Sequence, residues 1–573
     1  MFISSKKKIL SFSILLFMLA LLFSGCGTNI DNKNTSISNS SSFNNEDTNN
    51  TQNSLNEQKL TWELSDNPII DPSLNLSDSG FTVIRALYQG LTTLNDEGNV
   101  IPGVAENLPS VSTDGLNYKF KINKGAKWSD GKSVSSNDFV YSIKRALTLK
   151  KSPHVSELFN IKNAKAYYDN LVSFDEVGIK ALGDLDLEIT LNSPVPYFLE
   201  LLTNEIFMPL REDIISKVNE ENDSWTYDPK TCITNGPFKL KEWTKDSLLV
   251  VSRNEEFLNS KNIKLEDITF KIIKDENAAI SSFINDEIDF IKNPPISSIS
   301  ELTDKKAYKA FPFIGTYFLT INQSSEIEKI DPESAKVLKD VRIRKALSLA
   351  IDRQSIIDAI TMSGKPALAY VPYGVKDDKN EEFNDKKYIN DNDIETAKAL
   401  MMDAGYPNGK NFPTLKYIYN DDPNNLNKKI ATAIQSMWRD NLGITLEIKG
   451  EDPATFKIEK DSKQFVIIND TQIGDYMDAN TFLSKFYSKN EEDDVSYSNP
   501  IYDEKLEASF IELNSANRIK LLKDCESILL EDSPIIPIFF YAIPVAVKPY
   551  VKNVSILANG AVYFDNIYID KTN

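Results

Sequence analysis

Apolar and polar residues follow one another in patterns that predict strands in the first part of the chain. Residues 60–64 have the pattern of a first strand. Residues 118–122 alternate between apolar and polar side chains, which is typical of a strand with one buried face. The sequence Asn-Asp-Glu-Gly at residues 95–98 predicts a hairpin-type turn, because these residue types favour tight turns.

Other stretches have the spacing of amphipathic helices. Ser135 or Ser136 can cap a helix that extends to about Leu147, because a serine hydroxyl accepts hydrogen bonds from the free N–H groups of a first helical turn. Apolar residues recur three and four positions apart in three further segments, which are residues 83–91, 341–360 and 430–442.

The apolar run Phe-Val-Ile-Ile at residues 465–468 predicts a strand buried on both faces. Asn469, Asp470 and Gly474 interrupt the pattern and predict a loop. Asp475 would then lie beyond the carboxyl end of a strand, where ligands bind in open α/β sheets. A carboxylate there can pair with a cationic group such as a free α-ammonium. The alternative is an ordinary acidic residue in a helix cap or a solvated loop.

The amino terminus predicts a processed and lipidated export signal. Three lysines at 6–8 precede an apolar stretch, residues 9–23, that is too short for a convincing membrane span. Ser-Gly-Cys at 24–26 resembles the lipobox of bacterial lipoproteins, although Phe23 replaces the usual leucine. We expect a signal peptide over residues 1–25 and lipidation of Cys26, and the alternative is a secreted protein with a chance cysteine.

Residues 26–57 are rich in Asn, Ser and Thr and poor in apolar side chains, which predicts a flexible tether after the anchor. The sequence contains no second apolar run of spanning length, so the lipid would be the membrane attachment. The remaining cysteines, Cys232 and Cys525, do not make a disulfide framework and are expected as small buried residues.

Charge and composition argue against nucleic acid as a partner and against an enzyme. The chain has 64 Lys and Arg against 83 Asp and Glu, a formal charge of -19, whereas phosphate binding needs clustered basic residues. His154 is the only histidine, and the sequence lacks the G-x-S-x-G, P-loop and H-E-x-x-H motifs. The cysteines are not at metal-ligand spacing, so we expect neither a cofactor nor a metal.

A set of motifs in a fixed order resembles one protein family. Trp-Ser-Asp-Gly at 128–131 would be weak evidence alone, but the surrounding motifs keep the family's order and spacing over about sixty residues. Together they resemble the oligopeptide-binding proteins of ABC importers, solute-binding protein family 5. The resemblance covers essentially everything after the tether. It rests on residues 87–91, 102–106, 114–120, 124–131, 138–146, 193–198, 234–243, 341–353, 397–407 and 534–563.

The resemblance implies an α/β fold of the periplasmic-binding-protein type (type II), with two lobes, an inserted domain and a ligand cleft between the lobes. Residues 58–573 would form this solute-binding domain, and the lobes would close around the ligand by a hinge motion. The inserted domain would cover residues 96–184 and the second lobe residues 306–526. The first lobe would be assembled from residues 58–95, 185–305 and 527–573.

In the family, an extended peptide lies between the lobes, held by main-chain hydrogen bonds, with its side chains in roomy hydrated pockets. Its α-ammonium is held by the Asp of an Asp-Tyr pair, which corresponds here to Asp475 and Tyr476. Asn-Thr-Phe-Leu at residues 480–483 supports this register. We therefore predict that Asp475 faces the ligand.

Other positions carry over from the family with less direct support. Thr316 and Tyr317 correspond to a Thr-Tyr segment of the family, so Tyr317 is a candidate ligand contact. His154 lies in a segment where some members have a ligand-touching tyrosine, and the alternative for it is a surface or core role. Asn427 and Lys460 align near basic positions that some members use for the peptide carboxylate.

Two positions near Asp475 depart from the family. Gln472 stands where many members have tryptophan, and Asn469 replaces a basic residue of the preceding strand. Both changes remove groups that could stack on or pair with a peptide.

The function implied by the resemblance is that of an extracytoplasmic, lipid-anchored binding protein. It would act as a monomer on the outer face of the cell membrane, capture oligopeptides and deliver them to an ABC permease with its ATPase. The abundance of Asn, Lys and Ile together with the lipobox fits a Gram-positive bacterium. Alternatives left open are the same fold binding an oligosaccharide or a metal complex, and a surface peptide sensor or adhesin.

Overall fold

Two long antiparallel strands run through the fold in the computed structural model, which describes residues 57–218, 222–490 and 495–572. They are β12 (Tyr308–Ile321) and β17 (Ile535–Val547). Their pairing extends from Tyr308 opposite Ala546 to Thr320 opposite Ile535, with register shifts after Pro312 and Tyr317. Near the first shift, a Cβ on Gly315 would lie 2.9 Å from the ring of Tyr541, so only glycine fits there.

A long mixed sheet is built around these two strands. β12 pairs with β16 on one side, and β17 pairs with β11 on the other, so the pair joins two halves of the sheet. The order is β15-β14-β16-β12-β17-β11-β1-β10-β9-β8, with β13 also on β17. The other strands are β1 Lys59–Leu64, β8 Phe238–Thr244, β9 Leu248–Arg253, β10 Asp267–Ile272, β11 Phe290–Lys292, β13 Lys365–Pro366, β14 Leu415–Asn420, β15 Leu446–Glu451 and β16 Ile467–Ile473.

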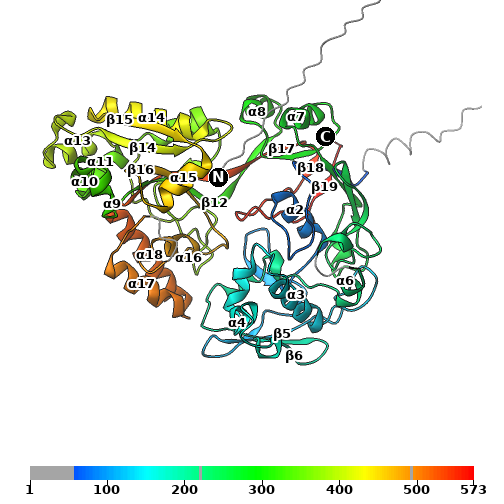
Figure 1. Cartoon of the computed structure of the whole chain (residues 1–573). Coiled ribbons are helices and arrows are strands. Elements are labelled where there is room, and N and C mark those ends of the chain that lie inside the picture. The colour runs from blue at the N-terminus through cyan, green and yellow to red at the C-terminus, as the bar shows by residue number, and fades with distance from the viewer. Residues whose placement is uncertain (1–56, 219–221, 491–494, 573) are drawn as a thin grey trace, which may run out of the picture. The chain divides into compact units, whose positions relative to one another are not determined.

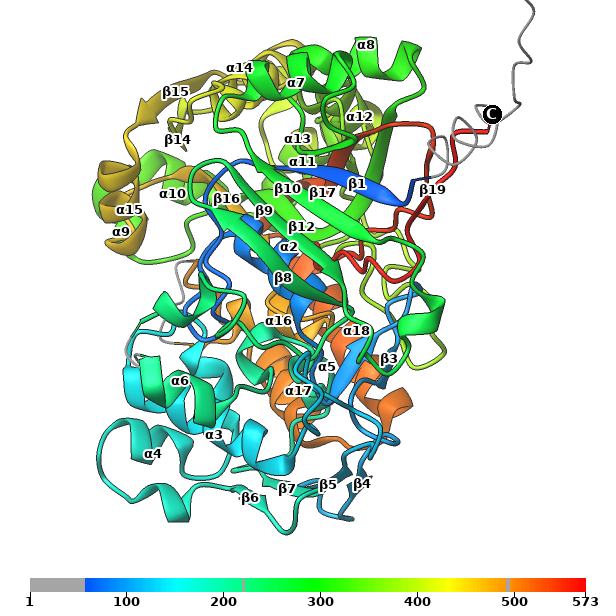
Figure 2. The same cartoon turned by 90° about the vertical axis from the view of Figure 1, so that its right-hand side faces the viewer.

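Smaller sheets complete the strand inventory of the described residues. Figure 2 shows β4–β7 together at one end, away from β1 and β8–β10. The small sheets consist of β4 Ser110–Val111, β5 Asn117–Lys121, β6 Ile179–Ala181 and β7 Asp186–Thr190, the hairpin β2 Thr92–Leu94 with β3 Val100–Pro102, and β18 Val551–Lys552 with β19 Tyr568–Ile569.

Helices cover the sheets and enclose several cores. In Figure 1, α14 lies along β14 and β15, and α17 and α18 pack on each other beside α16. The helices are α2 Asp78–Leu87, α3 Ser136–Leu149, α4 Ala164–Tyr168, α5 Phe198–Leu201, α6 Glu212–Val218, α7 Glu276–Ile284, α8 Ile299–Asp304, α9 Glu326–Ile330, α10 Pro332–Leu338, α11 Val341–Leu349, α12 Arg353–Ile356, α13 Ile394–Asp403, α14 Leu426–Leu442, α15 Pro453–Asp461, α16 Asn480–Leu483, α17 Pro500–Ile511 and α18 Ser515–Asp532.

A buried ion pair connects distant segments of the first half. The Arg145 guanidinium of α3 donates to both oxygens of Asp71, at 3.0 and 2.7 Å, and both side chains are almost fully buried. The Trp225 indole N–H and the Ser73 backbone N–H also donate to this carboxylate. With its hydrogen bonds satisfied, the buried charge of Asp71 is compensated.

Most sequence-predicted elements are present. Residues 60–64 lie in β1, residues 118–122 overlap β5, and the turn at 95–98 connects β2 and β3. The helix over 136–149 begins after Ser135, whose backbone N–H donates to Asp138 at 2.8 Å. Cys232 and Cys525 are free and buried, as predicted.

Three element boundaries were wrong. The strand predicted for 465–468 runs through Asn469 and Asp470 to Ile473, because β12 supplies pairing partners along that length. The helix predicted for 341–360 ends at Leu349, and a new one begins after Asp352, whose side chain caps α12. The helix predicted for 83–91 is displaced to α2, because Ser77 caps it earlier and the chain becomes extended at Tyr88.

The signal peptide, Cys26 and nearly all of the tether fall on residues 1–56, outside the described residues. Within the ranges that are described, no helix has both the length and the apolar character needed to cross a membrane. The division into lobes and an inserted domain at residues 95, 184, 305 and 526 stays a prediction.

Candidate functional site

The loop that follows β16 brings Asp475 to the wall of a cavity. Gly474 ends the strand pairing with a hydrogen bond from its N–H to the Ile314 carbonyl, at 2.9 Å. The Asp475 N–H donates to the Thr481 hydroxyl at 3.1 Å, and the Asp475 carbonyl accepts from the Asn204 amide at 3.4 Å. The backbone at Asp475 is thus fixed from two sides, and its side chain remains exposed.

We call this space the Asp475 cavity. Its volume is about 630 Å³, the open mouth included. Segments from five parts of the chain meet there, so none of them would form the site alone. The lining consists of Phe81, His154, Glu157, Asn204, Glu205, Ile206, Gly474, Asp475 and Asn559.

Two glutamates, the buried Glu205 and the partly buried Glu157, make the Asp475 cavity acidic. Glu157 accepts a hydrogen bond from the Asn204 amide at 2.8 Å and lies 3.5 Å from Nδ1 of the half-exposed His154. Burial, reinforced by the charges of Asp475 and Glu205, raises the pKa of Glu157 to about 8. Burial also raises the pKa of Glu205. A cation that enters would meet Asp475 and two carboxyl groups that gain from losing their protons.

Glu205 has an unused hydrogen-bonding atom. One of its oxygens accepts from the Asn75 amide at 2.6 Å, whereas the other is buried without a hydrogen-bond partner among the described residues. A positive charge near this side of the cavity belongs to Arg85, whose guanidinium lies 4.9 Å from the ring centre of Phe81. Arg85 lowers the pKa of both glutamates, but burial outweighs it.

Tyr476 and Gln472 hold the loop. The Tyr476 ring stacks on Tyr197 with 4.3 Å between ring centres and 4° between planes, and its hydroxyl accepts from the Asn480 amide. Gln472 donates to the carbonyls of Ile473 and Thr481. In this structure both side chains therefore act on the loop that carries Asp475.

The same loop is fastened further along by a bidentate ion pair. Arg518 of α18 donates to both oxygens of Asp478, each at 2.7 Å. The Arg518 guanidinium also lies 5.6 Å from the ring centre of Tyr197. Charge-assisted pairs of this kind are directional, so they fix the course of the chain after Asp475.

Tyr317 and Asn427 meet each other rather than Asp475. The Tyr317 hydroxyl donates to the Asn427 side chain at 3.0 Å, and the Tyr317 ring stacks on Phe539 with 5.0 Å between centres. Tyr317 is 1% exposed. Any contact of this ring with a ligand would need a rearrangement of its packing.

Lys460 belongs to a small buried charge cluster. Its ammonium donates to Asp470 of β16 at 2.7 Å, and Lys485 lies 3.5 Å from the other Asp470 oxygen. All three side chains are less than one fifth exposed. Asp470 thus holds two lysine side chains beside β16.

The sequence predicted only part of the Asp475 cavity. Asp475 and His154 were both predicted and lie on the same cavity wall. Glu157, Glu205 and Asn204 were missed. For Glu157 the one available signal was its position three residues after the only histidine. For Asn204 and Glu205 no local pattern indicates a cavity, because it forms only when distant segments meet.

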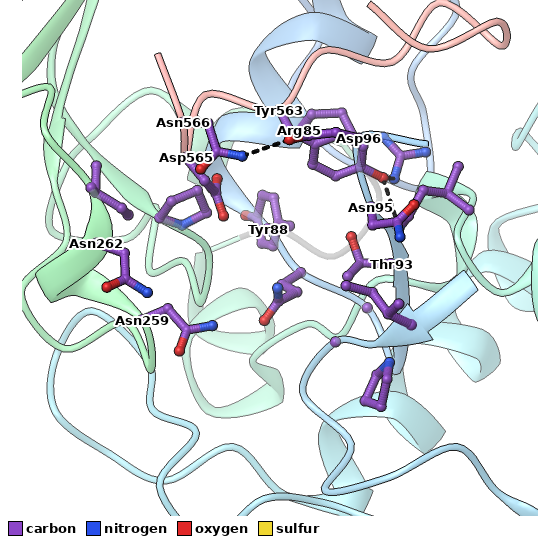
Figure 3. Close-up of a pocket in the computed structure, with 18 of the residues that line it drawn as sticks. Arg85, Tyr88, Thr93, Asn95, Asp96, Asn259, Asn262, Tyr563, Asp565 and Asn566 are labelled. Carbon is purple, nitrogen blue, oxygen red and sulfur yellow. Dashed lines mark hydrogen bonds between the residues drawn. The ribbon is translucent and has the colours of Figure 1, made fainter. Parts of the chain in front are cut away.

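A second cavity lies on the Arg85 side of α2. Figure 3 shows Tyr88, Thr93, Asn259 and Asn262 around it, with the Asn566 amide donating to Asp96 at 3.0 Å across one edge. Burial raises the pKa of the nearby Asp565 to about 6. None of the predicted site residues lines this cavity.

Sequence comparison connects these observations to known proteins. A profile of bacterial extracellular solute-binding proteins, family 5 Middle, matches residues 99–494. The oligopeptide-binding protein OppA of Bacillus subtilis is 32% identical over 498 residues, which cover 85% of this chain and 88% of that protein. The periplasmic murein peptide-binding protein MppA of Escherichia coli is 30% identical over 504 residues, with 87% and 90% covered.

Solved structures agree with the sequence comparison. MppA in an unliganded open form superimposes with a TM-score of 0.79 at 29% identity, covering 90% of this chain and 97% of that one. Listeria monocytogenes OppA bound to peptide gives 0.63 at 26% identity, with 90% and 99% covered. These matches confirm the mixed α/β fold that the sequence motifs implied. The chain belongs to family 5 of the bacterial extracellular solute-binding proteins.

Proposed function

We propose that this chain captures oligopeptides outside the cytoplasm for an ABC importer and holds the peptide amino terminus at Asp475. The family and the peptide-binding relatives support the transport role. Family 5 consists of binding proteins, so the prediction that the chain is not an enzyme is confirmed. The observation that carries the site assignment is the acidic Asp475 cavity, in which Asp475 is exposed beside the partly buried Glu157 and the buried Glu205.

An α-ammonium suits this cavity chemically. It brings one positive charge and up to three N–H donors, and a carboxylate is its natural acceptor. Asp475 can take one donor, and the free oxygen of Glu205 and the Asn204 side chain offer further polar contacts. An acetylated amino terminus has neither the charge nor the donors, so it would gain little there.

For the carboxylate end of the peptide, we assign Lys460 together with Lys485. Both lysines lie within 3.5 Å of Asp470 on β16, and an ammonium group is a strong hydrogen-bond donor to a carboxylate. Tyr317 and Asn427 come to the ligand in this proposal only after their mutual hydrogen bond opens. Gln472 contributes through the loop that carries Asp475.

Lobe closure around the peptide is part of the proposal. The long strands β12 and β17 are the natural hinge, because they join the two halves of the sheet and have register shifts near the crossing. MppA supports this motion. Its unliganded open form gives a TM-score of 0.79 with this chain, whereas another MppA structure gives 0.63.

Attachment to the cell surface completes the proposed function. A diacylglyceryl group on Cys26 would anchor the mature chain, and the polar tether up to residue 57 would let the binding domain reach the permease. In this proposal the lobes and the inserted domain have the boundaries predicted from the sequence, and the protein acts as a monomer. In this arrangement the domain shuttles between capture and delivery without leaving the membrane surface.

A ligand screen by thermal shift tests the proposal. The full-length chain in detergent is freed of bound ligand by partial unfolding and refolding, then mixed with short peptides, their N-acetylated forms, and cello- and chito-oligosaccharides. A ligand at about a hundred times its Kd adds roughly 2.7 kcal/mol to the unfolding free energy, which is a readable shift. Stabilisation by free-amine peptides is expected. Stabilisation by sugars alone would overturn the peptide assignment, and an equal response to acetylated peptides would overturn the role of Asp475.

A further inference from the structure

A third cavity lies where β1 ends and α2 begins. It occupies about 700 Å³, with its open mouth included, at the carboxyl ends of β1 and β10. In open α/β sheets this edge is where ligands bind. We call it the Glu63 cavity, and its charged lining residues are Glu63, Asp78, Lys274, Glu276 and Lys292.

Glu63 stands out among the residues of this cavity. Its side chain is 6% exposed, and no hydrogen bond or ion pair joins it to another of the described residues. Both lysines of the lining already form ion pairs. Lys292 pairs with Asp78, which also lines the cavity, at 2.5 Å, and Lys274 pairs with Asp246 at 2.8 Å. The lining therefore contains a buried carboxyl group whose hydrogen-bonding capacity is unused.

Other buried carboxyl groups of the chain differ from Glu63. Asp71 receives a bidentate arginine, and Glu526 accepts from the backbone N–H groups of Tyr370 and Val371. Such partners offset the cost of removing a carboxyl group from water. Glu63 has no such partner among the described residues and lines a cavity. Its carboxyl group can therefore accept hydrogen bonds from a ligand that enters the cavity. In keeping with this, burial raises the pKa of Glu63 to about 8, with Asp66, Asp78 and Glu276 adding to the effect.

The Glu63 cavity is adjacent to the Asp475 cavity. Asp78 lines the first and Phe81 the second, and they are three residues apart on α2, a rise of about 4.5 Å. At the other side, Asn559 lines the Asp475 cavity, and a Cβ on Gly560 would lie 3.7 Å from the Lys292 ammonium. A peptide whose amino terminus is at Asp475 has side chains within reach of Glu63, since extended residues advance about 3.3 Å each.

We propose that the Glu63 cavity accepts the basic side chain, lysine or arginine, of a residue near the amino terminus of the bound peptide. Glu63 is the counter-ion and gives its proton to solvent when the cation enters. Glu276 adds negative potential, whereas Asp78 stays paired with Lys292, and Lys274 stays paired with Asp246. The inference rests on the proposed peptide-binding function and adds a side-chain preference to it.

A positional scan with matched peptides tests this inference. Alanine tetrapeptides with free amino termini carry one lysine at each position in turn, and the reference peptides carry norleucine there, which keeps most of the aliphatic chain without the charge. Dissociation constants are measured by calorimetry with the full-length chain. At one position we expect lysine to bind about tenfold more tightly than norleucine, as a charge-assisted hydrogen bond would give.

The Glu63→Gln variant assigns the preference to one residue. It should bring the lysine-to-norleucine ratio close to one and leave the norleucine peptide unaffected, while Glu276→Gln at the exposed rim should retain most of the preference. If no position favours lysine in the unmodified chain, the inference is overturned whether or not the variant folds. Persistence of the preference in Glu63→Gln also overturns it. Failure of every peptide to bind would instead refute the proposed function.

Discussion

Replacement of Asp475 by asparagine tests the amino-terminal site most directly when it is combined with a change in the ligand. Asn keeps the size of the side chain and removes its charge. The backbone contacts of residue 475, to Thr481 and Asn204, do not involve the side chain, so the loop should keep its course. The second change is acetylation of the peptide amine. The four combinations form a thermodynamic cycle that isolates the pairing of carboxylate and ammonium.

The expected coupling follows from the surroundings of the cavity. Asp475 is exposed, so a binding ammonium displaces water from the surroundings of this carboxylate. A hydrogen bond to a charged group contributes about 1.5–3 kcal/mol under such exchange. Glu157, with its pKa at about 8, is mostly protonated at pH 7 and cannot replace the lost charge in full. We therefore expect about 2 kcal/mol, or roughly thirtyfold in Kd.

The assay is calorimetric titration at pH 7 and constant salt. Asp475→Asn should weaken the free-amine peptide about thirtyfold and change the acetylated peptide by less than about threefold. Asp440→Asn is the matched control, since Asp440 is exposed on α14 and paired with Arg439. Equal weakening of both peptides by Asp475→Asn would refute the reasoning, because the residue would then act on the loop and not on the amine.

Three further outcomes are expected. First, Glu157 has a folded-state pKa of about 8 against 4.5 when unfolded, so the folded state holds more protons between these values and stability falls as pH rises. Glu157→Gln should remove this loss, worth roughly 2 kcal/mol between pH 6 and pH 8, and an unchanged pH profile in urea unfolding would contradict it. Second, Asp71→Asn leaves the buried Arg145 without a counter-charge and should cost about 3–5 kcal/mol in urea unfolding, and a loss below about 1 kcal/mol would show that the pair is not needed. Third, Cys26→Ser should move the protein from the detergent phase to the aqueous phase in a cloud-point partition, and unchanged partition would argue against the lipid anchor.

Local sequence patterns predicted the elements whose formation depends on nearby residues. The alternation at 118–122 and the turn at 95–98 gave β5 and the β2–β3 hairpin. The helix after Ser135 was predicted from its cap, which a carboxylate at Asp138 completes. Local patterns failed where pairing with a strand distant in the sequence determines the end of an element. Asn469 and Asp470 favour a loop on their own, yet both extend β16 because β12 pairs with them and Asn469 accepts from the Asn420 N–H.

The broken helix after residue 349 has a similar cause. Helical periodicity continues through 341–360, but Arg353 is fully buried and donates to the Pro537 carbonyl of β17 at 2.8 Å. This contact, together with the Asp352 cap, favours the start of a new helix at Arg353. Sequence periodicity reports which residues are apolar and does not report a buried arginine that must reach a strand almost two hundred residues later.

The replacement of a basic residue by Asn469 need not remove carboxylate recognition from this chain. The Asn469 side chain is used within the sheet, where it accepts the Asn420 N–H at 3.0 Å. The next residue, Asp470, forms ion pairs with Lys460 of α15 and with Lys485, which follows α16. The second half of the fold therefore keeps two basic side chains near β16. In the proposed binding mode, the amino terminus of a peptide meets the carboxylates of the Asp475 cavity, and its carboxylate end meets these two lysines. An uncharged oligosaccharide would gain nothing from such a separation of charge, which favours a zwitterionic ligand for this protein.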